Sequence, residues 1–275
     1  MKMGIDVVIP TYNGKKLYNT IDLLNKGNLR PENIFCVFHK KFSLDRFRKF
    51  KNLKFVHSSF KGQVRQRNLG FKNCKSEIIL QLDDDVLLKK NTLKTMYNLK
   101  KKLGKKYLIG PKYKDKNNKF LYHDVSNEGF FKNLYKFFIC AAPFGKNKSG
   151  KITSLTLAYG TEHSNKTYSV SNWIPGGCVM FSKKMLSEKF VNYNFKGKAY
   201  CEDIFFSIQQ KSKGYKHVIC NKSIAIGEVD NAKIKFKDFC KEISVRKYLL
   251  KYTNGNIIRF YIWVFFDYFL RFLKF

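Results

Sequence analysis

Three consecutive aspartates are the residues of this chain with the clearest chemical potential. Asp83, Asp84 and Asp85, here called the aspartate triplet, follow directly after an apolar run at 77–82. Such a run predicts a buried strand, and open α/β sheets bind ligands beyond the carboxyl ends of their strands. Adjacent carboxylates repel one another, and their oxygens suit Mg²⁺ or Mn²⁺, which would share its coordination shell with substrate phosphates. The alternative is an acidic helix N-terminus, for which one aspartate would be enough.

Two further segments place polar groups at the ends of predicted elements. The apolar run at 5–10 ends in Pro10, Thr11 and Tyr12, which would line a ligand cleft in combination with the aspartate triplet. Taken alone, the segment is a weak signal because Pro, Asn and Gly often follow strands. The acidic pair at 202–203 begins a helix-like stretch, where the helix dipole also favours acidic side chains.

Short apolar runs and helix-like stretches alternate along the first half of the chain. This pattern predicts strands at 5–10, 33–38, 53–58, 77–82 and 107–110, and helices across 15–25, 62–74 and 91–103. Alternation of this kind is typical of an α/β fold, in which helices cover a largely parallel sheet.

The second half of the chain is less regular. Residues 111–170 are rich in Lys, Asn, Ser, Gly and Tyr, and their poor periodicity predicts loops and short antiparallel strands inserted into the fold. The later segments predict a strand at 172–183, short strands at 216–220 and 223–227, and helices at 201–214 and 238–251.

Length and composition limit the class of protein. The chain has 275 residues, of which 44% are hydrophobic and 16% aromatic, so it can bury a core and wholesale disorder is excluded. The length suits one large domain or two small ones. No run of about 18 uncharged apolar residues occurs, so we expect no clean membrane span. The apolar stretch at the N-terminus is too short for a signal peptide, so we expect a cytoplasmic protein.

The charge of the chain is strongly positive, at +34 from 54 basic and 20 acidic residues. Only eight of the basic residues are Arg, and the lysines are spread along the chain among residues that A/T-rich codons encode. A solvated lysine surface is one explanation, and attraction to nucleic acid, anionic lipid or phosphorylated substrates is the other. A nucleic-acid-binding protein would show clustered Arg and a binding motif, so we expect no nucleic-acid partner.

The seven cysteines do not form a recognisable pattern. They are widely spaced, and no CxxC motif occurs. This spacing argues against a disulfide framework and against a zinc ribbon. We therefore expect reduced, mostly buried thiols.

Five segments resemble, in order, the motifs of the family-2 glycosyltransferases of the GT-A fold. They cover about residues 5–214 and read IPTYNG, QRNLG, LQLDDDV, IPGGCVMF and CED. The resemblance implies a Rossmann-like, mainly parallel sheet flanked by helices. The patterns of the chain itself add an inserted acceptor-side region and a C-terminal amphipathic helix. We accordingly expect a GT-A domain at 1–230, divided into a nucleotide-sugar-binding half at 1–110 and an acceptor-side half at 111–230. A helical, membrane-associating segment would follow at 231–275.

The same resemblance implies a role for each motif. The donor would be a nucleotide sugar, and the metal would be Mn²⁺ or Mg²⁺, held by Asp83 and Asp85. Asp203 would act as the general base toward a hydroxyl of a glycan or lipid-linked acceptor, and a single displacement would invert the anomeric configuration. The residues implied to bind the donor or the acceptor, which include Asp83 again, are Pro10, Thr11, Tyr12, Arg67, Asn68, Asp83, Asp84, Gly176 and Gly177.

Two positions depart from the family pattern. Many relatives have an acidic residue after the second strand, which contacts the base of the nucleotide, but residues 38–41 here are Phe-His-Lys-Lys. Many also have a histidine after the ED helix, whereas this chain has Glu228 and Asp230 in that stretch. His217 occurs earlier, inside an apolar run, and we expect it to be structural.

The tail at 257–275 is almost wholly apolar or aromatic. Its four charged residues share one helical stripe, since Arg259, Asp267, Arg271 and Lys274 are spaced by 8, 4 and 3. This pattern predicts an interfacial helix, with the stripe in water and the basic surface attracted to anionic lipid. We therefore expect an enzyme on the inner face of the plasma membrane. The alternative is a C-terminal helix packed on the core or at a dimer interface.

Other functions compete with the glycosyltransferase interpretation. A nucleotidyltransferase acting on sugar phosphates would also use carboxylates and a metal at a sheet edge. It would be expected to have a glycine-rich basic loop after the first strand, where IPTYNGKK contains one Gly. A non-catalytic scaffold related to the glycosyltransferases is the third possibility. The sequence identifies neither the donor sugar and nucleotide nor the acceptor.

Overall fold

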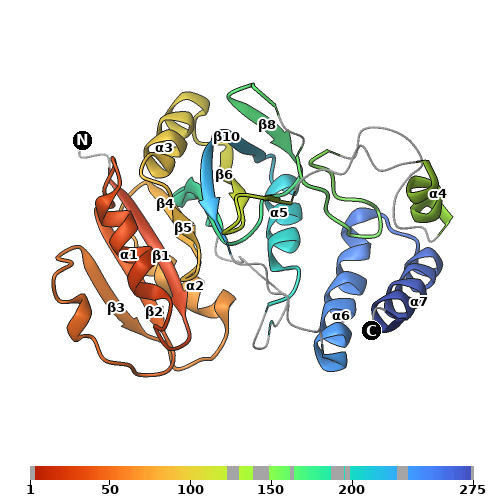
Figure 1. Cartoon of the computed structure of the whole chain (residues 1–275), viewed down its shortest axis with the longest axis horizontal. Coiled ribbons are helices and arrows are strands. Elements are labelled where there is room, and N and C mark those ends of the chain that lie inside the picture. The colour runs from red at the N-terminus through yellow and green to blue at the C-terminus, as the bar shows by residue number, and fades with distance from the viewer. Residues whose placement is uncertain are drawn as a thin grey trace.

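A ten-stranded sheet forms the centre of this computed structural model, in the strand order β3-β2-β1-β4-β9-β6-β10-β5 (Figure 1). Strands β7 and β8 pair with β6 and β10 beside this path. The structure describes residues 4–122, 130–138, 149–161, 164–186, 195, 199–227 and 235–273. Apolar clusters on the two faces of the sheet pack against helices, so the predicted α/β architecture is confirmed.

The first four strands make up the parallel part of the sheet. β1 (Ile5–Thr11) pairs in parallel with β2 (Asn33–Phe38) and β4 (Ile78–Leu82), and β2 pairs in parallel with β3 (Leu53–His57). β1 and β4 are buried along their whole length, as parallel strands covered on both faces are. Because the carboxyl ends of parallel strands meet at one edge, the loop after β1 lies beside the aspartate triplet after β4.

Two helices connect these strands and pack on opposite faces of the sheet. α1 (Leu17–Lys26) shares an apolar cluster with Val7, whereas α2 (Gln63–Asn73) packs on the face that carries Val8. A β-carbon on Gly70 would overlap the side chain of Val8, so only glycine allows α2 to approach the sheet this closely. The first turn of α2 thereby reaches the edge where the aspartate triplet lies.

The second half of the sheet is mixed. β6 (Tyr107–Lys114) runs parallel to β10 (Lys216–Ile226), and β9 (Cys178–Ser182) lies antiparallel between β4 and β6. The two short strands predicted near 216–227 are a single strand, β10, whose register against β6 shifts between Cys220 and Ile224. A short strand, β5 (Leu87–Leu88), pairs with the end of β10, and α3 (Thr92–Leu103) and α5 (Glu202–Ser212) pack against β10.

Two sequence predictions for the second half of the chain need correction. The strand predicted at 172–183 begins only at Cys178, because residues 172–177 form a loop that ends in a turn. Residues 111–170 contain the predicted short antiparallel strands, β7 (Phe120–Leu121) and β8 (Tyr168–Ser171), but also a helix, α4 (Phe130–Phe138). The signal for α4 was present in Phe130, Leu134 and Phe138, since apolar residues four apart share one helix face.

The C-terminal region consists of two helices, α6 (Phe236–Thr253) and α7 (Ile257–Leu273). α7 packs on the protein through Phe260 and Trp263, which share a buried cluster with Leu155 and Leu250. None of the helices in the described part of the chain combines the length and the hydropathy that a membrane crossing requires.

The charged stripe predicted for the tail does not all face water. Asp267 follows Phe260 and Trp263 at helical spacing and is half-buried on the side of α7 that packs against the protein. Arg259 is exposed, whereas the side chain of Arg271 and all of Lys274 lie outside the described residues. The opposite side of α7 is apolar and exposed.

Candidate active site

A cleft of about 520 Å³ lies at the carboxyl edge of β1 and β4. Its size is typical of pockets that bind small molecules and cofactors. The walls come from the loop after β1, the start of α2, the aspartate triplet, the β6–β7 hairpin and the loop before β9. The residues that line it include Pro10, Thr11, Tyr12, Lys61, Gln63, Asp83, Asp84, Asp85, Tyr113, Tyr122, Gly177 and Gly227.

The structure places most of the predicted donor-binding and metal-binding residues on this wall. Pro10, Thr11, Tyr12, the aspartate triplet and Gly177 all line the cleft. Arg67 and Gly176 lie behind the wall, and Asn68 is half-buried on α2. Asp203 lies at the start of α5, next to Gly176. Glu228 and Asp230, which stand where the family has a histidine, lie outside the described residues.

Each aspartate of the triplet has a different environment. Asp83 Oδ1 accepts hydrogen bonds from Gln63 Nε2 at 2.9 Å and from Arg67 Nη2 at 2.6 Å. The carboxylate of Asp84 accepts a hydrogen bond from the hydroxyl of Thr11, which joins the triplet to the end of β1. Asp85 forms an ion pair with Lys16 at 3.5 Å. The three carboxylates are thus fixed by α2, β1 and the loop before α1.

Two carboxylates of the triplet, Asp84 and Asp85, have raised pKa values. Burial, together with the charges of its two neighbours, raises the pKa of Asp84 to about 6, although the hydrogen bond from Thr11 opposes this. Burial and the charge of Asp83 also raise the pKa of Asp85. A divalent cation would relieve this repulsion, and Mg²⁺ or Mn²⁺ needs only one or two protein carboxylates when a diphosphate supplies further oxygens. The donor set of Asp83 and Asp85 therefore fits such a metal.

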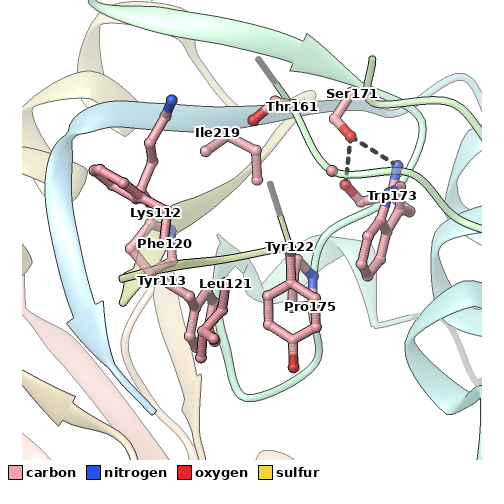
Figure 2. Close-up of a pocket in the computed structure, with 12 residues that line it drawn as sticks. Lys112, Tyr113, Phe120, Leu121, Tyr122, Thr161, Ser171, Trp173, Pro175 and Ile219 are labelled. Atoms are coloured by element: carbon pink, nitrogen blue, oxygen red, sulfur yellow. Dashed lines mark hydrogen bonds between the residues drawn. The ribbon is translucent and has the colours of Figure 1, made fainter. Parts of the chain in front are cut away.

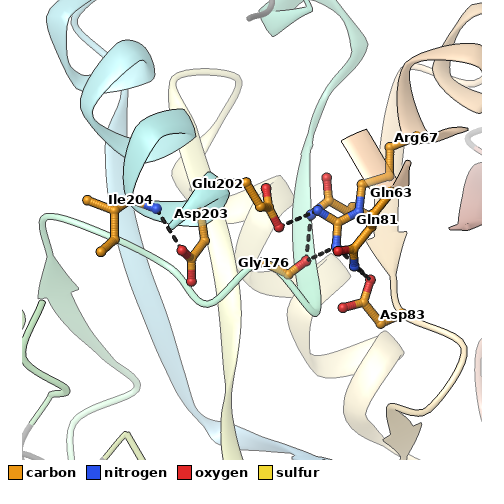
Figure 3. Close-up of polar contacts among 8 residues, drawn as sticks. All are labelled: Gln63, Arg67, Gln81, Asp83, Gly176, Glu202, Asp203 and Ile204. Carbon is orange, nitrogen blue, oxygen red and sulfur yellow. Dashed lines mark hydrogen bonds and ion pairs between the residues drawn. The ribbon is translucent and has the colours of Figure 1, made fainter. Parts of the chain in front are cut away.

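A buried arginine connects the triplet to the start of α5. Arg67 is 1% exposed, and its guanidinium donates to the carboxylates of Asp83 and Glu202 and, at 3.3 Å, to the carbonyl of Gly176 (Figure 3). The side chain of Gln81 donates to the same carbonyl. The resemblance implies that Arg67 lies on the diphosphate–ribose side of the donor, which stays a prediction; in the structure the buried guanidinium contacts protein carboxylates.

Burial and the ion pairs of this bridge have opposite effects on the pKa values of Arg67 and Glu202. Burial disfavours the charged guanidinium, but the charges of Asp83 and Glu202 outweigh it and raise the pKa of Arg67. Burial raises the pKa of Glu202 to about 7 in spite of the attraction of Arg67. A charge that is buried this deeply is tolerated only when it is paired and hydrogen-bonded. The charge of Arg67 therefore allows the acidic start of α5 to lie directly behind the cleft.

Asp203 occupies the first turn of α5, where its carboxylate accepts a hydrogen bond from the backbone N–H of Ile204 at 2.8 Å. Burial raises the pKa of Asp203, which makes the ionised carboxylate a stronger base. Gly176 allows this approach, because a β-carbon there would overlap the carboxylate of Glu202 and contact Asp203. The glycine thus accommodates the start of α5.

Sequence reasoning missed several residues of the cleft. Gln63 and Gln66 lie on one face of α2 with Arg67, and Gln66 donates to the carbonyls of Thr11 and Val37 at 2.7 and 2.8 Å. Their helical spacing was the available signal. Tyr122 comes from a segment without periodicity, and no sequence pattern indicated it.

An aromatic shelf, formed by Tyr12, His39 and Lys61, lies beside the ends of β1 and β2. The ring of Tyr12 is 47% exposed and stacks on that of His39, with ring centroids 6.1 Å apart. The amino group of Lys61 lies 4.9 Å from the centre of the Tyr12 ring. His39 stands where the sequence departs from the family, and its Nδ1 lies 3.1 Å from the carbonyl oxygen of Ser58.

His217 has no place in this cleft. It is 2% exposed within β10, and burial lowers its pKa to about 4. A neutral, buried histidine on a central strand agrees with the structural role expected for it.

Comparison with known proteins decides the family. The sequence model described as "Glycosyl transferase family 2" matches residues 6–188. The chain belongs to this family. No curated protein matches the chain. The match covers four of the five motif segments quoted above and ends before α5.

Solved structures show the same fold at low sequence identity. The structure is similar to that of S. aureus TarS 1–349, with a TM-score of 0.56 and 16% identity over 90% of this chain and 65% of that chain. It is also similar to GalNAc-T7 solved with UDP, GalNAc and Mn²⁺, with a TM-score of 0.62 and 12% identity over 90% of this chain and 49% of that chain. The predicted GT-A fold is therefore confirmed, and the chain spans less than two thirds of the length of these neighbours.

The Arg67 bridge generates a prediction for stability. Replacing Arg67 with Met removes the cation that pairs with Asp83 and Glu202, so we expect the free energy of unfolding to fall by about 3–5 kcal/mol. Adding Glu202→Gln should restore part of this loss, since one of the two charges is then removed. Urea unfolding monitored by circular dichroism measures both changes.

The matched control for this prediction is Arg65→Met on the exposed side of the same helix. We expect it to change the free energy of unfolding by less than about 0.5 kcal/mol. Equal unfolding midpoints for the Arg65 and Arg67 variants would show that the buried guanidinium does not stabilise the site.

Proposed function

We propose that this chain is a metal-dependent, inverting glycosyltransferase that moves a sugar from a nucleotide sugar to a hydroxyl of a glycan or lipid-linked acceptor. One observation carries the proposal: the aspartate triplet and the exposed ring of Tyr12 line one cleft, and Arg67 joins the triplet to the acidic start of α5 behind it. A diphosphate with its metal would suit the carboxylates, and a nucleotide base would suit an exposed aromatic ring. Membership of glycosyl transferase family 2 supports the same activity.

The donor is proposed to be a UDP-sugar. Two of the similar structures support this choice, since GalNAc-T7 was solved with UDP and Mn²⁺ and TarS 1–349 in complex with UDP-GlcNAc. The second of these structures has a TM-score of 0.56 and 16% identity to this chain. The shelf formed by Tyr12, His39 and Lys61 offers a flat surface and a cation beside the cleft, as a base and its ribose phosphate would require.

Asp83 and Asp85 are the residues that would hold Mn²⁺ or Mg²⁺. When bound, the metal would neutralise the charge that develops on the leaving diphosphate. Thr11 holds Asp84 away from this role through its hydrogen bond, and Arg67 orients Asp83. These contacts fix the carboxylates before any ligand arrives, which lowers the cost of organising the site.

The chemical step assigned to this chain is proton removal by Asp203. The acceptor oxygen forms a bond to the anomeric carbon as its proton passes to the carboxylate of Asp203. The bond from the anomeric carbon to the diphosphate oxygen breaks, and its electron pair leaves with the diphosphate. One displacement of this kind inverts the anomeric configuration and needs no covalent intermediate on Ser or Cys.

A membrane surface is proposed to hold the acceptor. The outward side of α7 exposes Ile258, Tyr261, Ile262 and Phe265, and α4 beside it exposes Phe131 by 83%. We call the exposed apolar residues of these two helices the α4/α7 surface. α4 and α7 lie next to each other in Figure 1, and the charge of Asp267 on α7 reaches Tyr135 on α4. Aromatic side chains beside a lysine-rich surface suit the headgroup layer of an anionic bilayer.

The metal prediction uses transfer from a UDP-sugar as its readout. Activity should vanish with EDTA and return with Mn²⁺ or Mg²⁺. Asp85→Asn should lower turnover by about 10²-fold or more, because one charge facing the metal is lost. Asp45→Asn is the control, since Asp45 is a solvent-exposed carboxylate outside the cleft. Full activity in EDTA would refute the metal requirement.

The prediction for the general base distinguishes the roles of two adjacent carboxylates. Asp203→Asn should lower kcat by about 10²–10⁴-fold with little change in donor affinity, because proton removal belongs to the transition state. Glu202→Gln should instead lower stability, since its partner is the buried Arg67. If Glu202→Gln lowers kcat and Asp203→Asn lowers only stability, Glu202 is the base. NMR of the product should show the inverted anomer, and a retained configuration would exclude single displacement.

The membrane prediction relies on point substitutions, because α7 also buries Phe260 and Trp263. Phe265→Asp should release the protein from vesicles of phosphatidylglycerol and phosphatidylethanolamine in a flotation assay. Val170→Asp is the control, since Val170 on β8 is 72% exposed and Phe265 is 65% exposed. Equal release by both variants would indicate that the lysine-rich surface alone binds the membrane.

A further inference from the structure

Tyr122 has an unusual backbone conformation for an aromatic residue. Its φ of 54° lies in the left-handed region, which bulky side chains rarely adopt. The side chain is nevertheless 54% exposed, so the ring is not held there to fill a core. Backbone strain at an exposed residue is typical of functional sites, where the surrounding structure maintains it.

Two buried aromatic residues hold the ring of Tyr122 in place. Tyr113 and Trp173 meet it edge to face, with ring centroids at 5.5 and 5.8 Å (Figure 2). Tyr113 and Trp173 are 5% and 6% exposed, and the indole N–H of Trp173 donates to the carbonyl of Tyr159 at 2.7 Å. The ring of Tyr122 is therefore presented to the cleft on a rigid support.

The ring lines the cleft beside the aspartate triplet, and it lies within electrostatic reach of Asp203. Tyr122 lines the cleft together with the aspartate triplet, and it also borders a second, smaller pocket lined by Phe120 and Trp173. After burial, the charge of Asp203 is the largest influence that raises the pKa of Tyr122, followed by those of Asp83 and Asp85. An acceptor hydroxyl must occupy this space, because it has to reach both the base and the anomeric carbon.

We propose that Tyr122 is the platform on which the ring of an acceptor sugar packs, so that one of its hydroxyls faces Asp203. The C–H groups on one face of a pyranose match the negative face of an aromatic ring. Tyr122 directly follows β7 and does not belong to the strands proposed to hold the nucleotide, which favours the acceptor over the donor sugar. The inference rests on the proposed function.

The test compares Tyr122→Leu with the unmodified enzyme, using a UDP-sugar, Mn²⁺ and a panel of octyl β-D-glycosides of glucose, galactose and N-acetylglucosamine as acceptors. The KM for the acceptor should rise by about five- to tenfold, the range expected for one lost aromatic contact. The KM for the donor and the rate of donor hydrolysis by water should stay within about twofold. Tyr122→Phe, which keeps the ring, should behave like the unmodified enzyme.

The matched control is Tyr252→Leu, since Tyr252 on α6 is 52% exposed and lies outside the cleft. It should leave the KM for the acceptor unchanged. A donor KM that rises as much as the acceptor KM would assign the ring to the donor sugar and overturn the proposal. An unchanged acceptor KM in Tyr122→Leu would do the same, as would failure of every glycoside to accept sugar while the donor is hydrolysed. Absence of donor hydrolysis as well would refute the proposed function itself.

Discussion

The pairing of one buried arginine with two carboxylates is the interaction on which the site depends. Arg67 comes from α2, Asp83 follows β4, and Glu202 begins α5, so a single guanidinium joins three elements. Removing these charges from water carries a large desolvation cost, which the two ion pairs and the hydrogen bond to Gly176 offset. Without that pairing, the carboxylates of the aspartate triplet and of the start of α5 would repel one another across the back of the cleft.

The distribution of charge follows from the same constraint. Five of the 20 acidic residues of a chain with a net charge of +34 lie in this one site, namely the aspartate triplet with Glu202 and Asp203. A lysine-rich exterior would attract a diphosphate, whereas the acidic cleft repels one unless a cation accompanies it. The combination favours an anionic donor that arrives with a divalent metal, and it distinguishes this cleft from a surface that binds anions indiscriminately.

The part of the site at the ends of β1 and β4 was predictable because its signals are local. An apolar run followed by Asp83 to Asp85, and another followed by Pro10 to Tyr12, identify strand ends, and parallel pairing brings strand ends together. The Arg67 bridge was not predictable, since its partner Glu202 is 135 residues away along the chain. Tyr122 lies in a segment without periodicity, so no pattern indicated it, whereas the helical spacing within α4 was present in a segment that was interpreted as loops and short strands. Helical spacing alone also could not show that Asp267 faces the protein, because this depends on which side of α7 packs.

Binding of a nucleotide sugar is the measurement that tests the central claim most directly. Isothermal titration calorimetry of the purified chain would compare UDP-glucose, UDP-N-acetylglucosamine, UDP-N-acetylgalactosamine and GDP-mannose, each with and without Mn²⁺. We predict one-to-one binding of at least one UDP-sugar, with a dissociation constant of about 1 μM to 1 mM, and its loss when Mn²⁺ is omitted. Failure of every nucleotide sugar to bind in the presence of Mn²⁺ would contradict the account.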